Sequence, residues 1–155
     1  VYFRPMHPTD EPTVRGLFYN LSQQAIYYRF MSHLKRIRQQ RIQNFVYIDH
    51  RNDVAIVAYQ PEAHGDEILA VGRYYLDPTT NRAEIAFTVR DDWQNRGVGS
   101  FLLKYLINIA RRNGISGFTA EILAENKAMQ SVMQKTGHAV RTRRDGGVVH
   151  VEIDF

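Results

Sequence analysis

The chain has 155 residues, a formal net charge of +4 and 44% hydrophobic residues, which suits one folded domain and not a disordered chain. It contains no cysteine, so disulfides, thiolate metal sites and thiol nucleophiles are excluded, and the composition fits a reducing cytoplasm. No apolar run approaches the roughly 20 residues that cross a bilayer, and no signal peptide opens the chain. Because the first residue is Val1 and not Met, we expect residues 1–155 to be a single domain excised from a longer multidomain protein.

The first third of the chain is predicted to be mostly helical. Residues 2–4 predict a short strand, and residues 11–21 predict a helix capped by Thr9 or Asp10. Weak helical periodicity then continues from residue 22 to residue 45.

Strands are predicted next. Runs of β-branched and aromatic residues at 54–59 and 68–76 predict two strands. A third strand is predicted over residues 82–89, where apolar residues alternate with mostly polar ones and so give the strand two different faces.

The last part of the chain alternates helices with strands. The clearest helix covers residues 98–112, and it is followed by a strand at 118–122 and a helix at 124–136. A hairpin about Asp145-Gly146-Gly147 ends the chain. This order predicts an α/β (α+β) fold with a mixed, mostly antiparallel central sheet and helices on both faces.

One segment has the features of an anion-binding site. The predicted strand that ends at Val89 leads through a polar turn into Gln94-Asn95-Arg96-Gly97-Val98-Gly99-Ser100, which opens the long helix. The first turn of a helix has backbone N–H groups without intrahelical partners, and the helix dipole adds positive charge there. Gly97 and Gly99 have no Cβ, so a pyrophosphate could approach the backbone closely. The alternative reading of the two glycines is tight packing at a strand–helix turn.

The same segment resembles the nucleotide loop of the GNAT superfamily of CoA-dependent N-acetyltransferases. The family pattern Gln/Arg-x-x-Gly-x-Gly/Ala is matched by Gln94, Gly97 and Gly99. A second family motif is matched by Asn126, Lys135 and Gly137, with His138 at the usual Phe position, and the resemblance covers about residues 53–150. Residues 83–92 and 27–30 look like the acetyltransferase domain of Pat-type bacterial protein lysine acetyltransferases, several of which are fused to an acyl-CoA synthetase-like region.

The resemblance implies a GNAT fold that binds acetyl-CoA as cosubstrate and needs no metal. Pantetheine would lie where the strand ending at Val89 parts from the strand at 118–122. The residues expected to bind the cofactor are Phe87, Thr88, Val89, Gln94, Asn95, Arg96, Gly97, Val98, Gly99, Ser100 and Asn126.

The resemblance also implies two catalytic groups. Glu84 corresponds to the general base of Pat-type domains, since an attacking amine must lose a proton. The alternative for Glu84 is an exposed strand carboxylate paired with Arg82 or Arg90. The backbone N–H of Val89 is the expected oxyanion donor. Many family members protonate the leaving thiolate with a Tyr; Met133 stands at that position, and we interpret it as a core residue.

We therefore expect direct transfer of an acetyl group from acetyl-CoA to a primary amine, with a protein lysine as the acceptor and no nucleic-acid or membrane partner. Two alternatives stay open: a small-molecule amine as acceptor on the same fold, and a non-catalytic CoA-sensing module. A nucleic-acid binder is disfavoured, because the sequence contains no recognition helix or base-stacking motif.

Overall fold

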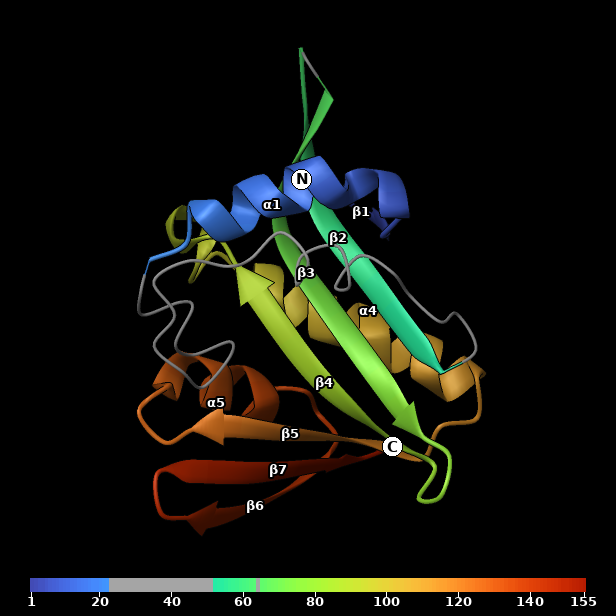
Figure 1. Ribbon diagram of the computed structural model, residues 1–155. Helices are drawn as coiled ribbons and strands as arrows, with labels where there is room; N and C mark the ends of the chain where they lie inside the picture. The colour runs from blue at the N-terminus through green and yellow to red at the C-terminus, as the bar shows by residue number, and fades with distance from the viewer. Residues whose placement is uncertain (23–51, 64) are drawn as a thin grey trace.

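A computed structural model describes residues 1–22, 52–63 and 65–155. In this part of the chain the strands form a seven-stranded sheet with the order β1-β2-β3-β4-β5-β7-β6 (Figure 1). Neighbouring strands are antiparallel except for β4 and β5, which are parallel, so the predicted mixed and mostly antiparallel sheet is confirmed. The strands are β1 (Tyr2–Pro5), β2 (Asp53–Glu62), β3 (Gly65–Asp77), β4 (Arg82–Val89), β5 (Gly117–Leu123), β6 (Ala139–Asp145) and β7 (Val148–Asp154).

Helices cover both faces of the sheet, as predicted. The helix α1 (Glu11–Tyr19) lies on one face, and α4 (Val98–Arg112) and α5 (Lys127–Gln134) lie on the other (Figure 1). Two short 3-10 helices, η1 (Pro8–Asp10) and η2 (Asp91–Trp93), precede α1 and the α4 loop. No helix in the ranges 1–22, 52–63 and 65–155 has the length and apolar content that crossing a membrane requires.

The alternation of side chains along the strands explains the two layers. On β2, Ile56 and Ala58 belong to the large core cluster beneath α4, whereas Ala55 and Val57 pack with residues of α1 in a smaller cluster. A strand with both faces covered has no polar side, which is why residues 54–59 read as one continuous apolar and aromatic run.

The sheet divides into two halves at β4 and β5. These strands are paired only at Arg82 with Gly117, Ala83 with Phe118, and Glu84 with Thr119. Beyond Glu84 they diverge (Figure 1). The family resemblance implied that the two strands part at this place, and the gap positions the site described below.

Several helix ends differ from the predicted ones. Asp10 does not cap α1 with its side chain; its carboxylate instead accepts hydrogen bonds from Arg4 at 2.8 Å and from the backbone N–H of His7 at 2.8 Å. The first helix ends at Tyr19, and α5 is shorter than predicted because Asn126 begins it. The helical periodicity predicted for residues 23–45 and the Pat-like residues 27–30 lie outside the described residues.

Candidate active site

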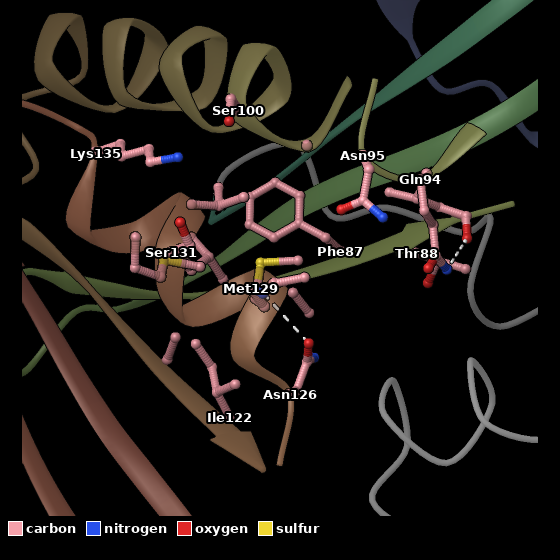
Figure 2. A pocket seen from close by; sticks show the side chains of 18 of the residues that line it. Phe87, Thr88, Gln94, Asn95, Ser100, Ile122, Asn126, Met129, Ser131 and Lys135 are labelled. Atoms are coloured by element: carbon pink, nitrogen blue, oxygen red, sulfur yellow. Dashed lines mark hydrogen bonds between the residues drawn. The ribbon is translucent and has the colours of Figure 1, made fainter. Parts of the chain in front are cut away.

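A cleft of about 700 Å³ opens where β4 and β5 diverge. Its walls come from the end of β4, the loop before α4, the start of α4, the outer part of β5 and one face of α5 (Figure 2). Most of the residues predicted to bind the cofactor line this cleft: Phe87, Thr88, Val89, Gln94, Asn95, Gly97, Gly99, Ser100 and Asn126. Phe87 and Asn126, which are almost forty positions apart in the sequence, therefore line the same cleft.

The loop that enters α4 leaves the helix start free. Gly97 precedes the helix with φ of 84°, and Asn95 has φ of 60°, so the chain turns through two left-handed residues before Val98. In residues 1–22, 52–63 and 65–155, no side chain caps the first turn of α4. A Cβ placed on Gly99 would have no heavy atom within 4 Å, other than its chain neighbours and the helix backbone beside it. The first-turn N–H groups and the space in front of Gly99 are thus available to an anion.

Two residues of the loop do not line the cleft. Arg96 is exposed, and its guanidinium lies 4.8 Å from the centre of the Trp93 ring. Val98 is 7% exposed and belongs to the core beneath the sheet. The matched motif is a run of consecutive residues, whereas the helical turn directs only part of this run toward the cleft.

The end of β4 presents backbone groups to the cleft. The N–H of Arg90 donates to the carbonyl of Leu69 on β3 at 2.8 Å. In an antiparallel pair the N–H groups alternate in direction, so the N–H of Val89 points away from β3. That direction leads into the gap left by β5.

The helix α5 forms the opposite wall. Asn126 begins this helix, and its side-chain oxygen accepts a hydrogen bond from the N–H of Met129 at 3.3 Å (Figure 2). Met129, Ser131 and Lys135 also line the cleft and were not among the predicted site residues. Ser131 and Lys135 are four positions apart and so share one side of the helix, and Lys135 was already part of the matched motif.

Met133 is both a core residue and a wall of the cleft. Its side chain is 1% exposed and packs in the large core cluster, which confirms the interpretation as core. It lines the cleft as well. The thioether has no proton to give, so this position cannot act as an acid.

Glu84 lies at the base of the cleft, on the last residue pair that joins β4 to β5. Its side chain is exposed. Neither of the predicted partners engages it: Arg82 pairs with Asp154, and Arg90 pairs with Glu67 and Asp92. Within the described ranges, the Glu84 carboxylate has no ion pair or side-chain hydrogen bond.

The neighbouring carboxylates are held in their charged forms by arginines. The hydrogen bond from Arg90 lowers the pKa of Asp92 below its ordinary value. Hydrogen bonds from Arg82 and Arg141 lower the pKa of Asp154 in the same way. These ion pairs hold the side chains of Arg82, Arg90 and Arg141 in place, so each guanidinium is already bound to a carboxylate.

Thr88 adds a polar group of a different kind. Its hydroxyl is buried, and in the part of the chain that the structure describes it has no hydrogen-bond partner. Thr88 lies opposite Val71, which packs beneath α1, so its side chain is on the face of β4 that points away from α4.

The two histidines of the C-terminal hairpin make structural contacts. Nδ1 of His150 lies 3.4 Å from a carboxylate oxygen of Glu121, and Glu121 lines the cleft. The ring of His138 packs edge-on against Phe155 with ring centres 5.8 Å apart.

Comparison with known proteins gives a consistent result. Residues 1–139 match the family model described as acetyltransferase (GNAT) domain. The chain is 37% identical to the acetyltransferase Pat of Mycolicibacterium smegmatis, over 99% of this chain and 45% of that protein. It therefore spans less than half the length of that relative.

Solved structures agree on the fold. The crystal structure of the GNAT domain of PAT from S. lividans superimposes with a TM-score of 0.86 at 30% identity, covering 99% of this chain and 89% of that chain. A ribosomal L7/L12 alpha-N-protein acetyltransferase in complex with coenzyme A superimposes with a TM-score of 0.72 over 97% of this chain and 90% of that chain. At 14% identity the second likeness concerns the fold alone.

Proposed function

Because the chain belongs to the acetyltransferase (GNAT) family, we propose that it transfers the acetyl group of acetyl-CoA directly to the side-chain amine of a protein lysine. The observation that carries this proposal is the cleft between β4 and β5, which brings together the start of α4, the edge of β4 and the carboxylate of Glu84, none of which has a partner there among the described residues. In an acyl transfer from CoA, these groups could bind the pyrophosphate, stabilise the oxyanion and accept the proton of the amine, respectively.

The cofactor would be held at the start of α4. The backbone N–H groups of the first turn would bind the pyrophosphate, and the side chains of Gln94, Asn95 and Ser100 add donors beside it. The open space in front of Gly99 fits a phosphate group. Asn126 would contact the pantetheine arm from the α5 side.

In the reaction the amine nitrogen attacks the thioester carbonyl carbon and forms a tetrahedral intermediate. The N–H of Val89 would donate to the oxygen that becomes negative, an interaction worth roughly 3 kcal/mol in other enzymes. The C–S bond then breaks, the amide is formed, and the thiolate of CoA leaves. Since Met133 has no proton to give, the thiolate is released as such or is protonated by water.

Glu84 would accept the proton of the amine. A strand rises about 3.3 Å per residue, so Glu84 and Val89 are separated by about 16 Å along β4. A side chain does not cover that distance, and the proton would travel through water molecules held in the cleft. The absence of an ion pair on Glu84 among the described residues supports this role, because a paired carboxylate is a weaker base.

The acceptor is assigned from similarity and from the charge of the cleft. The protein lysine rests on the similarity to Pat-type domains. The carboxylates of Glu84 and Glu121 both line the cleft, which also fits a polyamine.

The test is acetyl-CoA turnover with a panel of lysine peptides, free lysine and spermidine, using wild type, Glu84→Gln and the control Glu62→Gln. Glu62 is exposed on β2 and does not line the cleft. Glu84→Gln should lower the maximal rate by about 10²–10⁴-fold with acetyl-CoA affinity retained, the usual range for a positioned base. A chain that binds acetyl-CoA and modifies no amine would instead be a CoA-sensing module.

A further inference from the structure

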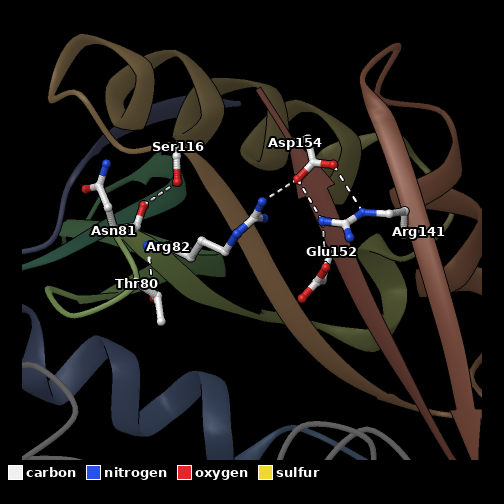
Figure 3. Close-up of polar contacts among 7 residues, drawn as sticks. All are labelled: Thr80, Asn81, Arg82, Ser116, Arg141, Glu152 and Asp154. Atoms are coloured by element: carbon white, nitrogen blue, oxygen red, sulfur yellow. Dashed lines mark hydrogen bonds and ion pairs between the residues drawn. The ribbon is translucent and has the colours of Figure 1, made fainter.

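The face of the sheet that points away from α4 carries a row of charged residues beside Glu84. Arg82 of β4, Gly117 of β5 and Asp154 of β7 are direct cross-strand neighbours, so they form one line across the junction of the two sheet halves. The guanidinium of Arg82 crosses over Gly117 and pairs with the carboxylate of Asp154 (Figure 3). A Cβ on Gly117 would lie 2.4 Å from the backbone oxygen of Ile153 and 2.6 Å from Nη1 of Arg82, so glycine leaves room both for the neighbouring strand and for the crossing arginine.

Asp154 is held from its other side by a second arginine. Arg141 of β6 donates to the two oxygens of Asp154 at 3.2 and 3.1 Å, and it also pairs with Glu152 at 2.7 Å (Figure 3). The position of the Asp154 carboxylate is therefore fixed by β6 as well as by β4. This carboxylate is an anchored partner for Arg82, not a freely moving one.

Arg82 has a second carboxylate within its reach. Arg82 and Glu84 are two positions apart on β4, so they project from the same face of the strand with Cα atoms about 7 Å apart. An arginine side chain spans that distance easily. Asp154 and Glu84 are thus alternative partners for one guanidinium, and in this structure Asp154 holds it.

We propose that Asp154 is a positioning residue that keeps Arg82 away from Glu84 and so leaves Glu84 unpaired in the cleft. This inference rests on the proposed function, in which Glu84 is the base. Without the carboxylate of Asp154, Arg82 turns toward Glu84. An adjacent arginine favours the ionised carboxylate, weakens it as a base, and occupies the space through which water carries the proton.

A double-mutant cycle with Asp154→Ala and Arg82→Met tests this arrangement. With a lysine peptide as acceptor, Asp154→Ala should lower kcat by about tenfold, because an arginine beside the Glu84 carboxylate weakens it as a base. The affinity for acetyl-CoA should stay the same. In the Arg82→Met background, Asp154→Ala should change kcat by less than about twofold, since no guanidinium is left to turn.

Two further variants complete the cycle. Arg141→Met is the matched control: it removes one of the two supports of Asp154 but leaves the Arg82–Asp154 pair, so kcat should fall by less than about twofold. Asp154→Glu should retain most of the rate because it keeps a carboxylate for Arg82. If Asp154→Ala folds poorly, Asp154→Asn removes the charge with the same shape, and the same comparison in the two backgrounds applies.

The outcomes separate this inference from the proposed function. If Asp154→Ala lowers kcat by the same factor with and without Arg82, Asp154 has only a structural role and the inference is wrong. An unchanged kcat in Asp154→Ala also overturns it, while Glu84 stands as the base. If Glu84→Gln turns over like the wild type, the base assignment fails and this inference fails with it.

Discussion

The side-chain amide of Gln94 donates a hydrogen bond of 3.2 Å to the backbone carbonyl of Val89, and thereby ties the loop before α4 to the last residue of β4 (Figure 2). In the proposed reaction the loop binds the pyrophosphate and Val89 supplies the oxyanion donor. One contact thus joins the place where the cofactor is held to the place where its thioester reacts.

Replacing Gln94 tests this connection. Gln94→Met keeps the length of the side chain and removes the donor, so the dissociation constant for acetyl-CoA should rise about 5- to 10-fold, the equivalent of about one hydrogen bond. Titration calorimetry with acetyl-CoA measures it. Gln134→Met, on the exposed end of α5, should leave the affinity unchanged. Equal affinity in both variants would show that the Gln94 contact does not support cofactor binding.

Gly99 provides a test of the phosphate site that is separate from folding. Because a Cβ on Gly99 would meet no heavy atom beyond the adjacent backbone within 4 Å, Gly99→Ala should keep the melting temperature within a few degrees of wild type. Gly99→Glu should fold as well but should lose acetyl-CoA binding, since its carboxylate would occupy the place of the phosphates and repel them. Normal affinity in a folded Gly99→Glu protein would contradict the phosphate site.

The fold was predictable from the sequence where the local signal and the tertiary environment agree. Residues 82–89 alternate because one face of β4 packs on α4 and the other does not, and the helix at 98–112 has a continuous apolar stripe against the sheet. Asp10 shows the opposite case. A helix-capping role was predicted from its position, but Arg4 lies across from it on β1 and binds its carboxylate. An ion pair between side chains of two different elements leaves no pattern in the local sequence, so it could not be predicted.

For the candidate site, the loop before α4 and the end of β4 were predictable from the sequence. The Gln-x-x-Gly-x-Gly pattern located the loop, and the residues of β4 followed from the strand that precedes it. The Arg82–Gly117–Asp154 line was not predictable, because it depends on the register of three strands that are distant in sequence. Without that register, Arg82 was naturally assigned to its near neighbour Glu84 as an alternative.

The pair of Arg4 and Asp10 predicts how stability depends on pH. Burial alone would raise the pKa of Asp10, but hydrogen bonds from Arg4 and from the N–H of His7, together with the charge of Arg4, outweigh burial and lower it below 3.8. A carboxyl whose pKa is lower in the folded state than in the unfolded state stabilises the fold at pH values above its unfolded-state pKa. That stabilisation is lost as the pH falls through the lower folded value.

Asp10→Asn should therefore reduce the free energy of unfolding at pH 7 and flatten its decline below about pH 4. Urea unfolding at a series of pH values between 2 and 7 measures both effects. Asp66→Asn is the matched control: Asp66 also contacts Arg4, at 3.5 Å, but its side chain is 40% exposed, so the change should be smaller. The same pH dependence in Asp10→Asn and wild type would show that the Arg4–Asp10 pair contributes no net stability.

Met133 lies where the core and the cleft meet, so its replacement should separate packing from chemistry. Met133→Ala removes a side chain that is 1% exposed and should lower the free energy of unfolding by roughly 2–5 kcal/mol. Met133→Leu conserves the volume and should cost less than about 1.5 kcal/mol. Because the thioether donates no proton, Met133→Leu should also turn over at nearly the wild-type rate when assayed well below its melting temperature. Thermal unfolding beside an acetyl-CoA turnover assay measures both properties. A large loss of rate in a stable Met133→Leu protein would mean that the sulfur itself contributes to the departure of the thiolate, and Met133 would then belong to the reacting groups.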